Sequence, residues 1–496
     1  MAREREVADA VVVGSGPNGL AAAVTLARAG LEVLVLEAED VPGGGARTLD
    51  LGLAPGIVHD ICSAVHPLAL ASPFFRDLDL VGRGVDLVVP DVAYAHPLDG
   101  GRAGLAYTSI ERTAAELGPD GAAWADLFAP LIDGWPELIA LVLGERPRGL
   151  AAGLSAAGPR LLAQAATRFL EQGSPGWNQR FDGDIAPALL TGVAGHAIGR
   201  LPSLVASGSM LMLGTLAHAI GWPIPVGGSG AITAALLADL EAHGSELRCG
   251  VRVRSWRELP RARAYLFDTS AAGLIEIWGD RMAPSVRAGM ARVRPGPGVA
   301  KVDYVLSGPV PWAHPGVGWA STVHIGGSRA EMVASEADAF AGRLSEHPMV
   351  LFSDPTVADA SREVAGLRPG WAYAHVPNDC PVDPVPLVTS QIERYAPGFA
   401  DIVVAARGVP ANEMVGHNAN YLGGDIAVGQ LSLLTMAQRP RRSLDAYASG
   451  VPGVYLCSAA ATPGPGVHGM SGWWAARRAL ADRFGRTEPV DLALSV

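Results

Sequence analysis

The sequence predicts an α/β protein in which a Rossmann-like nucleotide-binding domain joins an α+β domain that combines an antiparallel sheet with a helical insertion. Three observations predict this class. A strand, a glycine turn, a helix and a second strand open the chain, helical patterns dominate residues 71–221, and strand-like runs alternate with helices after residue 298. At 496 residues the chain exceeds the size of one hydrophobic core, so we expect two intertwined domains.

The opening unit begins with an apolar run at residues 10–13 that leads directly into a GxGxxG turn. Gly14 makes the tight turn, Gly16 lets backbone N–H groups approach a pyrophosphate, and Gly19 lets the helix pack closely on the strand. A second apolar strand delivers Glu37, whose carboxylate is placed to accept hydrogen bonds from a ribose diol. Because the helix N-terminus favours an anion, we interpret this unit as a dinucleotide-binding fingerprint.

Three further glycine-bearing loops are candidates for contact with a cofactor. The loop at residues 41–47 follows the fingerprint directly, so cofactor contact is favoured over a plain turn. The loop at 225–230 opens a helix and is either an anion contact or a helix cap. The loop at 463–469 precedes a helix predicted at 471–486, which places a second glycine-bearing helix N-terminus at the far end of the chain.

Composition and charge exclude several classes of function. A hydrophobic content of 49% and a charged content of 18% are typical of a globular protein. The formal net charge of −11, with no basic cluster, argues against nucleic acid as a partner. Lys301 is the only lysine, so a Schiff-base mechanism would depend on that side chain. The sequence carries no signal for oligomeric state.

The cysteines indicate neither a dithiol relay nor a metal site, since they are scattered and form no CxxC pair. They are Cys62, Cys249, Cys380 and Cys457. The charged residues 1–7 lead straight into the first strand and leave no room for a signal peptide, so we expect a cytoplasmic protein.

The middle of the chain predicts a mainly helical insertion that covers something apolar. Helical patterns lie near residues 108–116, 121–143 and 150–170. The stretch 201–222 carries no charged residue, and we favour a buried helix over a membrane span because it contains a proline and lacks flanking basic anchors. Peripheral membrane contact stays open.

The second half of the chain predicts an antiparallel sheet with helices on one face. Strand-like runs occur at 299–306, 318–325 and 349–353, with helical patterns at 329–343 and 388–395. We expect the nucleotide-binding domain to comprise residues 1–70, 222–290 and 441–496, and the second domain to comprise residues 71–221 and 291–440.

Two polar segments are candidate walls of a reaction site. His59, Asp60, Cys62, Ser63 and His66 lie close together, and the segment is either such a wall or a loop with locally hydrogen-bonded histidines. In the second segment, 416–426, hydrogen-bonding side chains lie in a glycine-bearing loop that is either a substrate site or a polar turn. The substrate-binding candidates there are His417, Asn420 and Tyr421.

Four motifs carry a resemblance to a known family. They are GGGAR at 43–47, HDICSAVHP at 59–67, NYLGGDI at 420–426 and PGPGVHGMSG at 463–472. With the opening fingerprint they resemble the FAD-dependent oxidoreductases of the phytoene desaturase and amine oxidase superfamily, and more narrowly its phytoene-dehydrogenase-like branch. The resemblance implies a Rossmann-like FAD-binding domain built from both ends of the chain.

The resemblance implies FAD as the cofactor and assigns residues to it. Val253 would face the adenine through its backbone, and residues 466–470 would lie against the flavin ring. Ser458 stands where many relatives have glycine. The implied cofactor-binding residues are Gly14, Gly16, Pro17, Asn18, Gly19, Glu37, Ala38, Gly44, Gly45, Ala46, Arg47, Val253, Ser458, Gly466, Val467, His468 and Met470.

The function that follows is hydride transfer between flavin and a largely apolar organic substrate such as a polyene or isoprenoid, with oxygen, a quinone or NAD(P) as electron acceptor. If the reaction needs a base, the candidates are His66, His468 and Asp425. Two alternatives are a redox-neutral flavin-dependent isomerase or cyclase, and a non-catalytic FAD-bound scaffold. No metal is expected.

Overall fold

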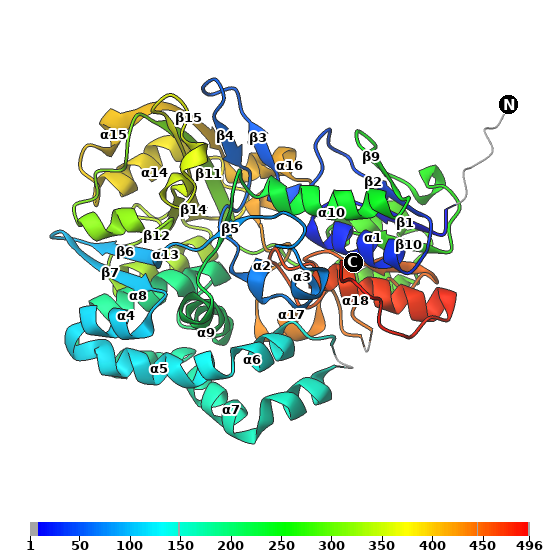
Figure 1. Cartoon of the computed structure of the whole chain (residues 1–496), viewed down its shortest axis with the longest axis horizontal. Coiled ribbons are helices and arrows are strands. Elements are labelled where there is room, and N and C mark those ends of the chain that lie inside the picture. The colour runs from blue at the N-terminus through cyan, green and yellow to red at the C-terminus, as the bar shows by residue number, and fades with distance from the viewer. Residues whose placement is uncertain (1–7, 147–148, 444, 495–496) are drawn as a thin grey trace.

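Two β-sheets organise the chain in the computed structural model, which describes residues 8–146, 149–443 and 445–494. A five-stranded parallel sheet and a seven-stranded mixed sheet lie on opposite sides of the molecule in Figure 1, each with its own helices. Two short two-stranded sheets complete the strands of the described residues. The predicted α/β class with a Rossmann-like unit is confirmed.

The parallel sheet gathers strands from both ends and the middle of the sequence. Its order is β16-β10-β1-β2-β9. The strands are β1 (Ala10–Val13), β2 (Val33–Leu36), β9 (Glu246–Arg248), β10 (Ala264–Phe267) and β16 (Val454–Leu456). β1 and β2 are buried throughout, which explains their unbroken apolar sequences, because helices cover a parallel sheet of this kind.

Helices α1 (Pro17–Arg28) and α18 (Met470–Ala479) hold the two ends of the chain together on this sheet. They cross closely, since a Cβ added to Gly472 would lie 1.8 Å from the carbonyl oxygen of Asn18. Only glycine fits at such a crossing. The predicted C-terminal helix at 471–486 is divided, because α18 gives way to a π-helical turn over Leu480–Phe484.

The seven-stranded sheet has the order β15-β11-β14-β13-β12-β6-β7, and all neighbours are antiparallel except β6 and β12. The strands are β6 (Val92–Leu98), β7 (Arg102–Tyr107), β11 (Gly298–Leu306), β12 (Thr322–Ile325), β13 (Val350–Ser353), β14 (Arg368–Val376) and β15 (Val403–Val409).

Four of these strands were not predicted from the sequence: β6, β7, β14 and β15. The expectation of a mainly helical insertion at 71–221 is therefore wrong for residues 92–107, which join this sheet as β6 and β7. All of β6 is buried, so its sequence lacks the alternation that marks a half-exposed strand. The parallel pair of β6 and β12 also makes the sheet mixed, where a purely antiparallel one was expected.

Most of the rest of the insertion is helical. Its helices are α4 (Ile110–Glu116), α5 (Gly121–Asp133), α6 (Trp135–Val142), α7 (Leu150–Gln172), α8 (Ile185–Ala194) and α9 (Leu204–Ala219). The single helix expected at 121–143 is wrong, because the chain breaks at Gly134. The charge-free stretch at 201–222 forms α9, which packs against α5 and α8 as the expected buried helix. Of the helices described, none is long and apolar enough to cross a membrane.

The remaining elements are short and cover the sheets or connect them. The helices are α2 (Pro67–Ala71), α3 (Pro73–Leu78), α10 (Gly230–Ala242), α11 (Ala271–Trp278), α12 (Pro284–Met290), α13 (Arg329–Phe340), α14 (Pro384–Glu393), α15 (Phe399–Ile402), α16 (Met414–His417) and α17 (Leu433–Gln438). The strands are β3 (Thr48–Asp50), β4 (Val58–Asp60), β5 (Leu87–Val88) and β8 (Ile224–Pro225).

The two large sheets divide the described chain into two groups of segments. The parallel sheet takes its strands from residues 1–70, 222–290 and 441–496, and the mixed sheet takes its strands from 71–221 and 291–440. We propose these groups as a nucleotide-binding domain and a substrate domain.

Candidate cofactor and substrate site

A cavity of about 620 Å³ extends from the carboxyl ends of β1, β2 and β10 to the mixed sheet and α9. In an open parallel sheet this edge is where nucleotides bind. The predicted site residues that line the cavity are Gly14, Gly16, Pro17, Asn18, Glu37, Ala38, Gly44, Gly45, Arg47, His66, Val253, Asn420, Tyr421, Ser458, Gly466, Val467 and His468. Those outside its lining are Gly19, Ala46, His417, Asp425 and Met470.

Glu37 is held rigidly at one end of the cavity. Its Oε2 accepts hydrogen bonds from the backbone N–H of Ser15 at 2.8 Å and from the Ser15 hydroxyl at 2.5 Å. Its Oε1 accepts from the N–H of Glu39 at 2.9 Å. These contacts tie the end of β2 to the glycine turn after β1, so the carboxylate is presented to the cavity in one orientation.

The glycine loops leave room that side chains would fill. Gly44 approaches the fingerprint turn so closely that an added Cβ would lie 2.9 Å from the Cα of Gly16. A Cβ on Gly19 would lie 2.2 Å from the carbonyl oxygen of Gly14, so this glycine lets α1 pack on β1 and lies behind the cavity wall. A cradle of this kind fits the phosphates of a dinucleotide.

Asp268 lines the cavity but was not predicted as a site residue from the sequence. It follows β10, and its Oδ2 accepts a hydrogen bond from the N–H of Gly19 at 3.0 Å. Burial raises the pKa of this carboxyl to about 7, and the nearby Glu37 adds to the rise. The position of Asp268 in the sequence could have identified it, because an acidic residue at the carboxyl end of a parallel strand lies at the nucleotide-binding edge.

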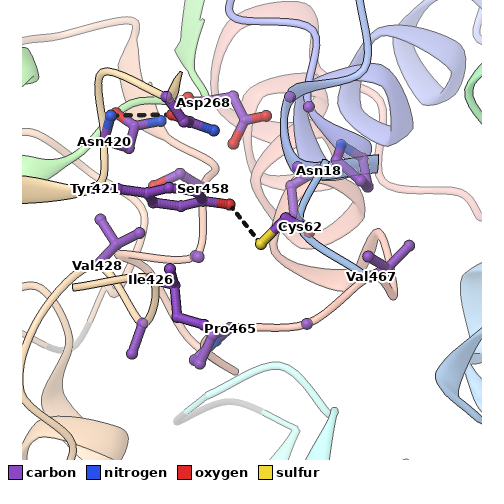
Figure 2. Close-up of a pocket in the computed structure, with 18 of the residues that line it drawn as sticks. Asn18, Cys62, Asp268, Asn420, Tyr421, Ile426, Val428, Ser458, Pro465 and Val467 are labelled. Atoms are coloured by element: carbon purple, nitrogen blue, oxygen red, sulfur yellow. Dashed lines mark hydrogen bonds between the residues drawn. The ribbon is translucent and has the colours of Figure 1, made fainter. Parts of the chain in front are cut away.

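Asn420 and Tyr421 bring the 416–426 loop to the same wall (Figure 2). The Asn420 side chain donates to the backbone oxygen of Asp268 at 3.2 Å and accepts from the N–H of Ser270 at 2.7 Å. The Tyr421 hydroxyl donates to the sulfur of Cys62 at 3.3 Å. Burial raises the pKa of the Cys62 thiol, so it forms an uncharged part of the wall.

Arg47 fastens this loop to the GGGAR turn. Its guanidinium donates to the carbonyl oxygen of Gly44 at 2.8 Å and to that of His417 at 2.7 Å. The His417 ring hydrogen-bonds the carbonyl oxygen of Ile61 at 2.9 Å, outside the cavity lining. His417 therefore contributes its backbone to the architecture of the site.

The three candidate bases differ in how many of their polar atoms are already hydrogen-bonded. The N–H of Met470 donates to Nδ1 of His468, so Nε2 of that ring carries the proton and donates to the oxygen of Gly464. Both nitrogens of His468 are thus engaged in its own loop. The carboxylate of Asp425 accepts from three backbone N–H groups, those of Gly296, Ala427 and Gly429.

His66 keeps a nitrogen lone pair. The hydroxyl of Ser229 donates to the carbonyl oxygen of Ser63, so it accepts from Nε2–H of His66 at 2.7 Å. The proton therefore lies on Nε2, and Nδ1 is unprotonated. Burial lowers the pKa of His66 to about 4, so the ring is neutral near pH 7.

The far end of the cavity is an apolar chamber. Side chains of the helical insertion and of the 426–436 segment form much of its wall, among them Val205, Met212, Leu213, Ile426, Val428 and Met436. The charged side chains of the described lining are Glu37, Glu39, Arg47, Arg252, Asp268 and Glu276, and they lie at the nucleotide end or beside it. A chamber with an uncharged lining therefore adjoins a polar nucleotide site.

Known proteins resemble this chain over segments of different length. Residues 12–78 match the model of an NAD(P)-binding Rossmann-like domain. Pyridine nucleotide-disulfide oxidoreductase domain-containing protein 2 of Rattus norvegicus is 25% identical over 96% of this chain and 93% of its own. Hydroxyneurosporene desaturase of Cereibacter sphaeroides is 41% identical over 76 residues, 15% of this chain and 14% of its own.

The fold agrees with solved structures. Cyclohexylamine oxidase from Brevibacterium oxydans IH-35A superposes with a TM-score of 0.56 at 14% identity, over 97% of this chain and 100% of that chain. The fingerprint, the cavity and the relatives agree with the resemblance carried by the four motifs. By these comparisons the chain is similar to the FAD-dependent oxidoreductases of the phytoene desaturase and amine oxidase superfamily.

Proposed function

We propose that the protein transfers hydride between FAD and a largely apolar organic substrate of the polyene or isoprenoid kind. The observation that carries this proposal is one cavity that joins the glycine loops of β1 and β2 to a chamber walled by apolar side chains. FAD, when bound, supplies the hydride chemistry. The chain must then position a C–H bond and exclude water.

The residues divide this work between them. We propose that the turn at 14–19 holds the phosphates of FAD, Glu37 holds the ribose, and Val253 faces the adenine. Arg47, Ser458 and residues 466–468 would hold the flavin side. The apolar chamber would exclude water from the reacting carbon.

For a reaction that also releases a proton from the substrate, we propose His66 as the acceptor. It lines the cavity, its Nε2–H is fixed by Ser229, and Nδ1 is unprotonated. His468 and Asp425 are already fully hydrogen-bonded to the backbone, which favours positioning roles for both.

The test uses the protein as purified. We expect a flavin absorbance spectrum, release of FAD on denaturation, and anaerobic bleaching of the flavin by an apolar substrate drawn from a polyene and isoprenoid panel. The product should have lost a pair of hydrogens by mass spectrometry, and oxygen, quinone or NAD(P) should restore the flavin colour. Flavin that dithionite reduces but no member of the panel reduces would contradict the proposal. A product of unchanged mass, formed only with added reductant, would favour an isomerase.

The role of His66 has its own measurement. His66→Gln should keep bound FAD but slow flavin reduction by substrate about a hundredfold or more, the usual contribution of a positioned base. His243→Gln on the surface of the nucleotide-binding side is the matched control. Equal reduction rates in His66→Gln and the parent protein would remove His66 from the mechanism.

A further inference from the structure

A row of three polar side chains crosses the mixed sheet at the wall of the chamber. Thr322 on β12 lies opposite Ser353 on β13, and Ser353 lies opposite Trp371 on β14. Residues directly opposite one another in antiparallel strands point to the same face of a sheet. Thr322 and Trp371 both line the cavity, so the row lies on the chamber side of the sheet, and Ser353 is fully buried between them without lining the cavity itself.

Each member of the row has a buried polar atom without a partner. The atoms are Oγ1 of Thr322, Oγ of Ser353 and Nε1 of Trp371, and none has a hydrogen bond within the part of the chain that the structure describes. Thr322 is 2% exposed and Trp371 is 5% exposed. Buried polar groups in proteins are nearly always hydrogen-bonded, so three unpaired groups in one row beside a cavity point to a bound partner.

Two neutral histidines and one buried ion pair lie beside the row. His324, two residues along β12, and His196, which lines the cavity, hydrogen-bond each other through their Nε2 atoms at 2.9 Å. Burial lowers the pKa of His196 to about 4 and that of His324 well below its usual value, so both rings are neutral near pH 7. Asp303 on β11 lies directly opposite Trp371 at one end of the row, and its carboxylate forms a buried ion pair with Lys301.

We propose that the row of Thr322, Ser353 and Trp371 binds an uncharged oxygen function, a hydroxyl or ketone, on an otherwise apolar substrate. The indole N–H donates to an oxygen, and the two hydroxyls donate or accept. A substrate carboxylate is disfavoured there, because the Lys301 ammonium is already paired and the carboxylate of Asp303 lies opposite Trp371. This inference rests on the proposed function and adds to it that the substrate is oxygenated and that the row anchors it.

The test measures binding to the FAD-loaded protein, with three probes of one branched skeleton: the hydrocarbon phytane, the alcohol phytol and the acid phytanic acid. Titrations follow the perturbation of the flavin spectrum in the absence of turnover. We expect phytol to bind about tenfold or more tightly than phytane, because the hydrocarbon leaves the buried polar atoms of the row unpaired. Phytanate should bind no more tightly than phytane.

Near-isosteric variants assign the preference to the row. Thr322→Val and Trp371→Phe should each reduce the preference for phytol severalfold while phytane binding stays the same. Ser321→Ala is the matched control, because Ser321 is the preceding residue, its hydroxyl is also buried and unpartnered, and it does not line the cavity.

The outcomes separate this inference from the proposed function. Equal binding of phytol and phytane, or a preference unchanged in both variants, overturns the anchoring row but leaves an apolar-substrate oxidoreductase in place. Equal binding together with a thermal midpoint lowered by Thr322→Val would show that ordered water occupies the row. If neither phytol nor phytane perturbs the flavin spectrum, both the proposed function and the anchoring role of the row are contradicted.

Discussion

The two ends of the cavity are built by different means. At the nucleotide end, tight glycine turns and fixed charged groups meet within short stretches of sequence, as Glu37 and Ser15 do across the opening unit. At the chamber end, neutral side chains from α9, β12 and β14 converge from positions far apart in the chain. The first arrangement suits a cofactor of fixed shape and charge, and the second suits a substrate recognised by its bulk and a few hydrogen bonds.

The largest effect is expected at the nucleotide end. Gly19→Ala places a Cβ 2.2 Å from the carbonyl oxygen of Gly14, so α1 must move away from β1. We expect loss of bound FAD and destabilisation of about 1–3 kcal/mol. Flavin content after purification and thermal unfolding measure both effects.

The control for this substitution is Gly308→Ala, where an added Cβ meets no atom. It should keep full flavin content. A Gly19→Ala protein that retains FAD at the level of Gly308→Ala would show that the close packing of α1 does not govern cofactor binding.

An intermediate effect is expected from the pH dependence of FAD binding. Asp268 has a pKa raised to about 7 and lies beside the proposed phosphate cradle. Its charged form, together with that of Glu37, would repel phosphate. The FAD affinity of the apoprotein should therefore fall as the pH rises through about 7, and Asp268→Asn should bind FAD more tightly at pH 8 with a flatter profile. Fluorescence titrations at several pH values measure this.

The raised pKa of Asp268 also predicts how the stability of the folded protein changes with pH. A carboxyl whose pKa is raised on folding stabilises the native state most fully below its unfolded pKa, and this contribution is lost progressively as the pH rises from about 4, the usual carboxyl pKa, to about 7. The unfolding midpoint of the apoprotein should fall over this window in the parent and less so in Asp268→Asn. Parallel pH profiles for the two proteins would rule out titration of Asp268 there.

The smallest effect is expected where the two ends of the cavity meet. Tyr421→Phe removes the hydrogen bond to the Cys62 sulfur, a bond that lowers the pKa of the thiol against the rise caused by burial. Alkylation of Cys62 by iodoacetamide near pH 8 should slow severalfold, as followed by peptide mass spectrometry. Cys249, far from Tyr421 in sequence and facing Glu37 and Asp40, serves as the internal control. Faster alkylation of Cys62 would show that the tyrosine shields the thiol.

Local sequence predicted the strands and turns of the nucleotide end because their signals are short-range. The run at 10–13, the turn at 14–19 and the strand that ends at Glu37 are neighbours in the chain, and each has a composition that only a few backbone geometries satisfy. β6 was not predicted from the sequence, because a strand buried on both faces has no alternation of polar and apolar residues.

Contacts between distant segments decided the rest. No pattern around Asp268 shows that its carboxylate meets the N–H of Gly19, and nothing near Thr322 or Trp371 shows that they share a row across the sheet. The sequence by itself determined the fold class, the fingerprint and the cofactor family, since these depend on local geometry and on motifs. Tertiary structure decided which polar atoms remain unpaired and which histidine keeps a lone pair, because burial and hydrogen-bond partners exist only once strands and loops far apart in the chain have packed together.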